Sequence, residues 1–210
     1  MLGIAKKTIQ PLSLPFMRAT PLIFATNNPH KIQEVRSLLN DSFTLITLTE
    51  AGIDINIEEP HDTLWENALE KSKTIYQLTG SNCFSEDTGL EVDALGGAPG
   101  VHTARYAGAT ATPDQHMAKL LSSLGAHTNR AAQFRTVISL IEEGKELFFE
   151  GVCKGHIAQT VSGKKGFGYD PVFIPEGATR CFAEMELEEK NFYSHRRKAF
   201  DQLKHYLLSK

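Results

Sequence analysis

The stretch Ser85-Glu86-Asp87-Thr88-Gly89-Leu90-Glu91-Val92 places two adjacent carboxylates between two short runs with strand character. We expect the acidic pair to sit on a turn, because a hydroxyl residue and a glycine follow it. Adjacent carboxylates at the mouth of a turn are unfavourable unless a positive charge neutralises them, and a hard divalent cation is the simplest candidate. The alternative is an exposed acidic hairpin. Other segments of the chain favour the metal site.

A strand, a polar turn and a helix are predicted near the start of the chain. The apolar run Leu22–Ala25 is followed by Thr26-Asn27-Asn28-Pro29-His30-Lys31, after which apolar residues recur at helical spacing. Such a turn directs backbone N–H groups and a helix N-terminus at one spot, which favours an anion, and Lys31 adds a full positive charge. The alternative is a helix N-cap followed by a surface lysine. A Walker loop is excluded, because its glycines and its Gly-Lys-Ser/Thr end are missing.

The remaining segments predict an α/β protein with a mixed sheet. Thr63, with Glu66 three residues later, starts a helix in a capping box, and Gly80 ends it. We expect Trp65 to lie in the core. The other predicted elements are a strand at 43–48, a helix between Thr112 and Gly125, an antiparallel hairpin of residues 132–141 and 146–155, a strand at 172–174 and a helix after Ser194.

Three stretches carry polar or aromatic groups that have two interpretations each. Arg105, in a small and apolar setting, is either half of a structural ion pair or a phosphate contact. The ring of Phe167, between two glycines, offers a platform on which a base or sugar could stack, unless the segment is an ordinary glycine loop. Ser194 places His195 and Arg196 in the first turn of the last helix, where the helix dipole disfavours cations. They indicate an anionic or carbonyl-rich partner, or else a solvated basic patch.

Composition and charge limit the class of protein. With 210 residues, 41% of them hydrophobic, the chain fits a globular protein with one large core. A net charge of -3 without a long basic run argues against bulk electrostatic binding of a nucleic acid polymer, although one nucleotide could still bind. The three widely spaced cysteines indicate neither a disulfide framework nor a CxxC site.

The sequence predicts a cytoplasmic protein. No apolar run approaches the roughly 20 residues that span a bilayer. Residues 1–20 lack the apolar core of a secretory signal, and we expect them to form a poorly ordered N-terminal extension.

Four stretches together resemble one family: Thr26–Lys31, Glu86–Leu90, Phe167–Pro171 and Ser194–Arg196. Their order and spacing are similar to those of the non-canonical purine nucleoside triphosphate pyrophosphatases, the inosine/xanthosine triphosphatase family. The similarity runs from about Leu22 to the C-terminus. It implies an elongated mixed α/β fold, with residues 21–210 forming one domain of two lobes around a substrate cleft. It also implies a homodimer that hydrolyses dITP, ITP and XTP to the monophosphate and pyrophosphate with Mg²⁺.

The resemblance also implies roles for individual residues. The triphosphate would be bound by Thr26, Asn27, Asn28, Pro29, His30 and Lys31, with Lys31 also catalytic. Asp87 matches the general base and metal ligand, and Glu59 matches the second acidic ligand. Glu58 and Glu86 are further metal candidates, because each adjoins one of these acids and many bacterial members have Asp-Asp-Ser in place of Glu86-Asp87-Thr88. Substrate contacts are implied for Thr88, Phe167, Gly168, Tyr169, Asp170, Lys190, His195 and Arg196.

The implied reaction needs neutralised phosphate charge, an aligned water and a proton acceptor. Mg²⁺ held by Glu59 and Asp87 would act as the Lewis acid. Asp87 is the preferred base, and a metal-bound hydroxide oriented by Asp87 is equally compatible. Donors from Lys190, His195 or Arg196 would favour the 6-oxo acceptor of hypoxanthine and xanthine over the 6-amino donor of adenine.

Two other functions remain open at this point. One is a pyrophosphatase that acts on modified pyrimidines or on dUTP. The other is a nucleotide-binding regulatory protein without turnover. The clustered acids favour an enzyme, because a protein that only binds a triphosphate would gain little from several carboxylates.

Overall fold

The structure is a computed structural model that describes residues 21–39 and 43–209, so the expectation for residues 1–20 lies outside the described residues. Within those ranges seven strands form one sheet, in the order β2-β1-β3-β5-β6-β7, with β4 paired to β3. The strands are β1 (Leu22–Phe24), β2 (Leu45–Thr47), β3 (Cys83–Val92), β4 (Pro99–Gly100), β5 (Ala131–Glu142), β6 (Lys145–Ile157) and β7 (Phe173–Pro175).

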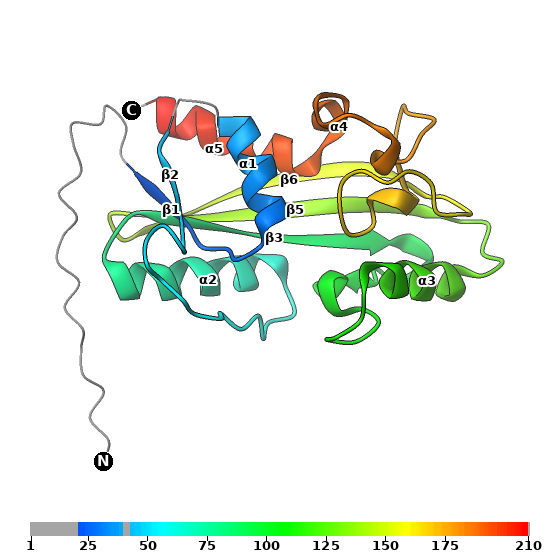
Figure 1. The fold of residues 1–210 in the computed structure, drawn as a ribbon, viewed down its shortest axis with the longest axis horizontal. Helices are drawn as coiled ribbons and strands as arrows, with labels where there is room; N and C mark the ends of the chain where they lie inside the picture. The colour runs from blue at the N-terminus through cyan, green and yellow to red at the C-terminus, as the bar shows by residue number, and fades with distance from the viewer. Residues whose placement is uncertain (1–20, 40–42, 210) are drawn as a thin grey trace, which may run out of the picture.

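The sheet is mixed, as the hairpin pattern predicts. β1 pairs in parallel with β2 and β3, whereas β5 pairs antiparallel with both β3 and β6. The β5–β6 hairpin turns at Glu143 and Gly144, whose φ angles of 50° and 79° are the left-handed values that a two-residue hairpin turn requires. β3, β5 and β6 run along the long axis of an elongated molecule (Figure 1). The predicted fold class is confirmed.

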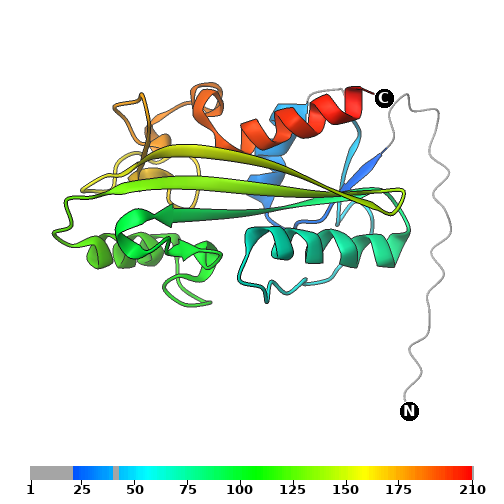
Figure 2. The same cartoon turned by 180° about the vertical axis from the view of Figure 1, so that it is seen from behind.

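Helices cover both faces of the sheet. They are α1 (Pro29–Leu39), α2 (Leu64–Thr79), α3 (Pro113–Leu124), α4 (Leu187–Tyr193) and α5 (His195–Leu208). α2 and α3 lie on one face, and α1, α4 and α5 lie on the other, a division that is also clear from behind (Figure 2). Among the helices of the described ranges, none is long and apolar enough to cross a bilayer.

The predicted caps set the ends of the helices. The side chain of Thr63 accepts a hydrogen bond from the backbone N–H of Glu66 at 3.2 Å, and Gly80, at φ 65°, ends α2. The predicted capping box is only half formed, since the Glu66 carboxylate accepts from the Thr63 hydroxyl at 2.7 Å. Thr112 forms a full capping box at α3, and Ser194 caps α5.

Three buried phenylalanines fix α5 against the sheet. Phe84 of β3 stacks on Phe24 of β1, with ring centroids 4.5 Å apart, and meets Phe200 of α5 edge-on at 5.7 Å. Each is at most 1% exposed. Truncating such a side chain to alanine typically costs about 3–5 kcal/mol. The contact therefore packs the N-terminal half of α5 against the start of β3.

Two expectations from the sequence are wrong. Trp65 is 37% exposed rather than in the core. The buried face of α2 carries Leu64, Ala68 and Ile75, and Trp65, one residue after Leu64, lies about 100° around the helix from it. The acidic pair does not sit on a turn either, because residues 83–92 form one continuous strand. The alternative of an exposed hairpin is also wrong.

Candidate active site

A pocket of about 560 Å³ lies where the end of β1, the centre of β3 and the loop before β7 meet. It brings together most of the residues that the sequence analysis singled out. They are Thr26, Asn27, Asn28, His30, Lys31, Glu59, Asp87, Thr88, Phe167, Gly168, Tyr169, Asp170, Lys190, His195 and Arg196. Pro29, Glu58 and Glu86 do not line it. Arg105 also lies outside the lining, and it contacts Glu59 as a structural ion pair at 3.6 Å.

Asn28 organises the turn at the start of α1. Its side-chain oxygen accepts hydrogen bonds from the backbone N–H groups of His30 and Lys31 at 3.0 and 3.2 Å, and Pro29 occupies the first helical position. Two of the N–H groups that were expected to meet an anion are therefore already satisfied by Asn28. The positive charge at this end of the pocket comes from Lys31, whose side chain is 15% exposed.

Strand geometry sends Glu86 and Asp87 to opposite faces of the sheet, because successive side chains of a strand alternate. Glu86 is 1% exposed and faces α1 and α5, where it accepts from Nε of Arg196 at 2.9 Å and lies 3.3 Å from Nζ of Lys31. Burial alone would raise the pKa of Glu86, but Arg196 and Lys31 lower it from 4.5 to about 2. Both oxygens of Glu86 are thus bound within the protein.

Asp87 faces α2 and shares a cation with Glu59. Nζ of Lys71 donates to Oδ1 of Asp87 at 3.1 Å and also to the Glu59 carboxylate. Burial raises the pKa of Asp87, although Lys71 and Lys31 oppose the shift. Asn67, also on α2, holds the loop that carries Glu59, because its amide bonds the backbone N–H and carbonyl of His61 at 2.9 and 3.0 Å.

The acidic side of the pocket fits a hard cation. Oδ2 of Asp87 is buried and has no hydrogen-bond partner among the described residues. An unpaired carboxylate oxygen beside a second carboxylate suits Mg²⁺, which is commonly held by one or two carboxylates together with phosphate oxygens and water. Nowhere in residues 21–39 and 43–209 do three His, Cys, Asp or Glu side chains gather as a metal cage. Glu59 and Asp87 are the two carboxylates lining this pocket beside each other that could hold such an ion.

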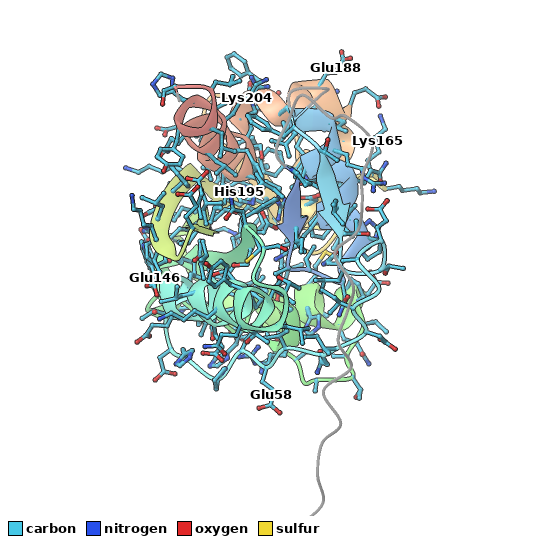
Figure 3. The ribbon with its side chains drawn as sticks, turned by 90° about the vertical axis from the view of Figure 1, so that its left-hand side faces the viewer. Glu58, Glu146, Lys165, Glu188, His195 and Lys204 are labelled. Atoms are coloured by element: carbon cyan, nitrogen blue, oxygen red, sulfur yellow. The ribbon has the colours of Figure 1, made fainter. Side chains whose placement is uncertain are left out.

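Glu58 does not belong to this cluster. It is exposed, and it extends from the edge of the molecule into open space, whereas His195 lies inside (Figure 3). Of the two adjacent acids at 58 and 59, the structure directs only Glu59 into the pocket.

The opposite end of the pocket is built on Phe167. Its ring stacks against that of His30 with centroids 5.2 Å apart, and the cationic groups of Lys190 and Arg196 lie 5.3 and 5.5 Å from its centre. The segment is held by Asp170, which accepts from the Phe167 N–H at 2.9 Å and from Lys190 at 2.6 Å. An aromatic face with cationic donors beside it is suited to a polar heterocycle.

The first turn of α5 supplies a neutral and a charged donor. Arg196 is 2% exposed and is bound by carboxylates, so the alternative of a solvated basic patch is wrong. The ring of His195 stacks on Phe134 at 4.7 Å, and its Nδ1 has no hydrogen-bond partner among the described residues. Burial and the nearby cations, Arg196 first, lower the pKa of His195 well below 6.5, which keeps the imidazole neutral.

Sequence analysis missed two charged residues at this site, Glu34 and Lys71. Each lies on the buried face of an amphipathic helix, Glu34 beside Val35 on α1 and Lys71 beside Ser72 on α2. The sequence held a signal for both, which is a charged residue on an otherwise apolar helical face. Because such a group is almost never fully buried unless it is paired, its position predicts a buried partner of opposite charge.

The fold and pocket define an α/β protein whose pocket combines a lysine-bearing turn, two carboxylates and an aromatic platform with cationic donors. The chain belongs to the Ham1 family, whose profile matches residues 22–206.

Relatives and solved structures agree with this membership. A dITP/XTP pyrophosphatase of Porphyromonas gingivalis is 51% identical over 188 residues, which cover 89% of this chain and 97% of the relative. One of Flavobacterium johnsoniae is 48% identical over 87% of this chain and 95% of its own length. The structure of a HAM1 protein from Coxiella burnetii superposes with a TM-score of 0.84 at 37% identity, covering 91% of this chain and all of that one (100%).

Proposed function

We propose that this protein hydrolyses the non-canonical purine nucleoside triphosphates dITP, ITP and XTP to the monophosphate and pyrophosphate, and so removes them from the nucleotide pool. The observation that carries the proposal is the convergence of Lys31, Asp87, Phe167 and His195 on one pocket. The names of the relatives, dITP/XTP pyrophosphatases, support the same activity. The proposed homodimer, the two-lobed domain and the cytoplasmic location stay predictions.

The phosphate end of the pocket would align the triphosphate for attack. Lys31 would bind phosphate oxygens, assisted by the side chains of Thr26 and Asn28, which line the same surface. Glu59 and Asp87 would hold Mg²⁺, which when bound supplies Lewis-acid neutralisation of the phosphate charge. Asp87 would also orient the attacking water and take its proton, with its two carboxylate oxygens dividing the ion and the water between them.

The other end would select the base. The purine would stack on Phe167, and donors from Lys190, His195 and Arg196 would meet the 6-oxo group of hypoxanthine or xanthine. Adenine carries a 6-amino group, which is itself a donor, so the donors of these three side chains would have no acceptor to bind. A site built to bond one polar group can reject an analogue that lacks it by a factor of about 10⁴.

Pyrophosphate release from ITP, dITP, XTP, dUTP and ATP, with Mg²⁺ and after chelation, tests the proposal. We expect turnover of the first three substrates, little turnover of dUTP and ATP, and loss of activity on chelation that added Mg²⁺ restores. A preference for dUTP would favour the pyrimidine alternative. Tight binding of ITP without pyrophosphate release would favour the regulatory one.

A further inference from the structure

A buried chain of alternating charges connects the two ends of the pocket. It contains three cations and three carboxylates, each with a side chain at most 15% exposed. In order along the chain they are Lys31, Glu86, Arg196, Glu34, Lys190 and Asp170. The charges balance, and each neighbouring pair in this series is in ion-pair contact.

Glu34 is the carboxylate at the centre of the base-reading half. One of its oxygens accepts from Nζ of Lys190 at 2.7 Å, and the other accepts from Nη1 of Arg196. Burial alone would raise the pKa of Glu34, but Arg196 and Lys190 lower it, so the residue stays ionised. Lys190 and Arg196 line the pocket and Glu34 does not.

We propose that Glu34 is a positioning residue for purine selection, which holds Lys190 and Arg196 in fixed directions beside Phe167 without touching the substrate. The inference rests on the proposed function, because it concerns how that site distinguishes an oxo-purine from adenine. Glu34 lies on α1 one turn after Lys31, so the helix whose N-terminal turn would bind the phosphates also orients the groups that would read the base.

Charge balance gives the physical reason. Without the negative charge of Glu34, the one carboxylate left to Lys190 is Asp170, and the one left to Arg196 is Glu86. The three cations of the chain would then face two carboxylates. A lysine with one partner instead of two has more freedom to rotate, and a displacement of about 1 Å can cost roughly 100-fold in rate. Selection by hydrogen bonds to a 6-oxo group depends on that fixed direction. Lys31 keeps its contact with Glu86 and is left as it was.

The variant Glu34→Gln tests this, because it removes the charge and keeps the shape. We expect kcat/KM for ITP to fall by roughly 100-fold, with a much smaller change for ATP, so that the ITP-to-ATP ratio collapses. Inhibition by inorganic tripolyphosphate, which has no base, should stay within about twofold, the usual margin for independent sites. An unchanged ratio would overturn the inference, and so would an equal weakening of ITP turnover and tripolyphosphate inhibition.

Controls separate this role from general damage. Glu146 lies at the edge of the molecule (Figure 3). Glu146→Gln removes the carboxylate of its exposed ion pair with Lys73, at 2.9 Å, and should leave the ITP-to-ATP ratio unchanged. If Glu34→Gln does not fold, Glu34→Asp is the second variant. It keeps the negative charge but withdraws the carboxylate from Lys190 and Arg196 by one methylene, and it should also lower the ITP-to-ATP ratio. If the unmodified protein itself fails to prefer ITP over ATP, the proposed function fails. A preference that survives both Glu34 variants defeats only this inference.

Discussion

Nζ of Lys71 lies 3.1 Å from Oδ1 of Asp87, and the same ammonium is bound by Glu59. The contact brings an acid from a loop and an acid from the central strand to one point on the α2 side of the sheet. Glu86, the immediate neighbour of Asp87, faces the other side and binds Arg196. Two adjacent carboxylates thus face different surroundings, which is why we propose a chemical role for one and a structural role for the other.

Asp87→Asn should lower turnover by a factor of about 10²–10⁴, the usual contribution of a general base. The amide keeps the shape of the side chain and can still accept from Lys71, so the melting temperature should stay close to that of the parent. Pyrophosphate release at saturating ITP measures the effect. Glu58→Gln, at the exposed neighbour of Glu59, is the matched control and should remain fully active. Activity of the Asn variant within about tenfold of the parent would remove Asp87 from the catalytic role.

Arg196→Ala should erode the preference for ITP over ATP and also destabilise the fold. It removes a buried cation from Glu86 and Glu34, and breaking such a pair typically costs about 3–5 kcal/mol. Urea unfolding and the ITP-to-ATP ratio of kcat/KM measure the two effects. Arg197→Ala, at the next residue, removes only a surface ion pair with Asp201. It should therefore change neither the stability nor the ITP-to-ATP ratio by much. A ratio equal to that of the parent would contradict the assignment of Arg196 to base reading.

Phe167→Ala should weaken binding of the base and spare that of the phosphates. Loss of one base–aromatic stack costs about 1–3 kcal/mol, so the KM for ITP should rise by roughly five- to 150-fold. Inhibition by tripolyphosphate should not change. Phe192→Ala is the control, because that ring is 82% exposed and lies outside the pocket lining. Equal loss of ITP and tripolyphosphate binding would show that Phe167 supports the fold rather than stacking on a base.

Stability should fall as the pH drops below about 6.5, because of His195. Its folded pKa lies well below 6.5, so the unfolded chain takes up the proton first as the pH falls. The contribution of neutral His195 to the free energy of unfolding is therefore complete above pH 6.5 and is lost as the pH falls below it. The free energy of unfolding should change with a slope approaching about 1.4 kcal/mol per pH unit for one proton. Urea unfolding between pH 7.5 and 5.5 measures the slope. His195→Gln should flatten it, whereas His127→Gln, at an exposed histidine, should not; equal slopes in all three proteins would refute the assignment.

Local signals in the sequence predicted most of the elements. Thr63, Gly80, Thr112 and Ser194 act at the helix ends where capping rules place them. The hairpin pattern predicted the antiparallel half of the sheet. The errors at Trp65 and at the acidic pair arose where a local pattern suits two structures. A carboxylate pair followed by threonine and glycine resembles a turn, and only pairing with β1 and β5 on both sides makes it the central strand.

The sequence by itself determined the family resemblance and the types of residue at the site, because motif order, capping and hydrophobic period are local properties. Only the tertiary structure decided that Glu59 rather than Glu58 enters the pocket, that Glu86 binds Arg196, and that Glu34 and Lys71 belong to the site. The reason is distance along the chain. Glu34 and Arg196 are separated by 162 positions and Glu86 and Arg196 by 110, and buried ions acquire their roles from partners that folding alone brings within reach.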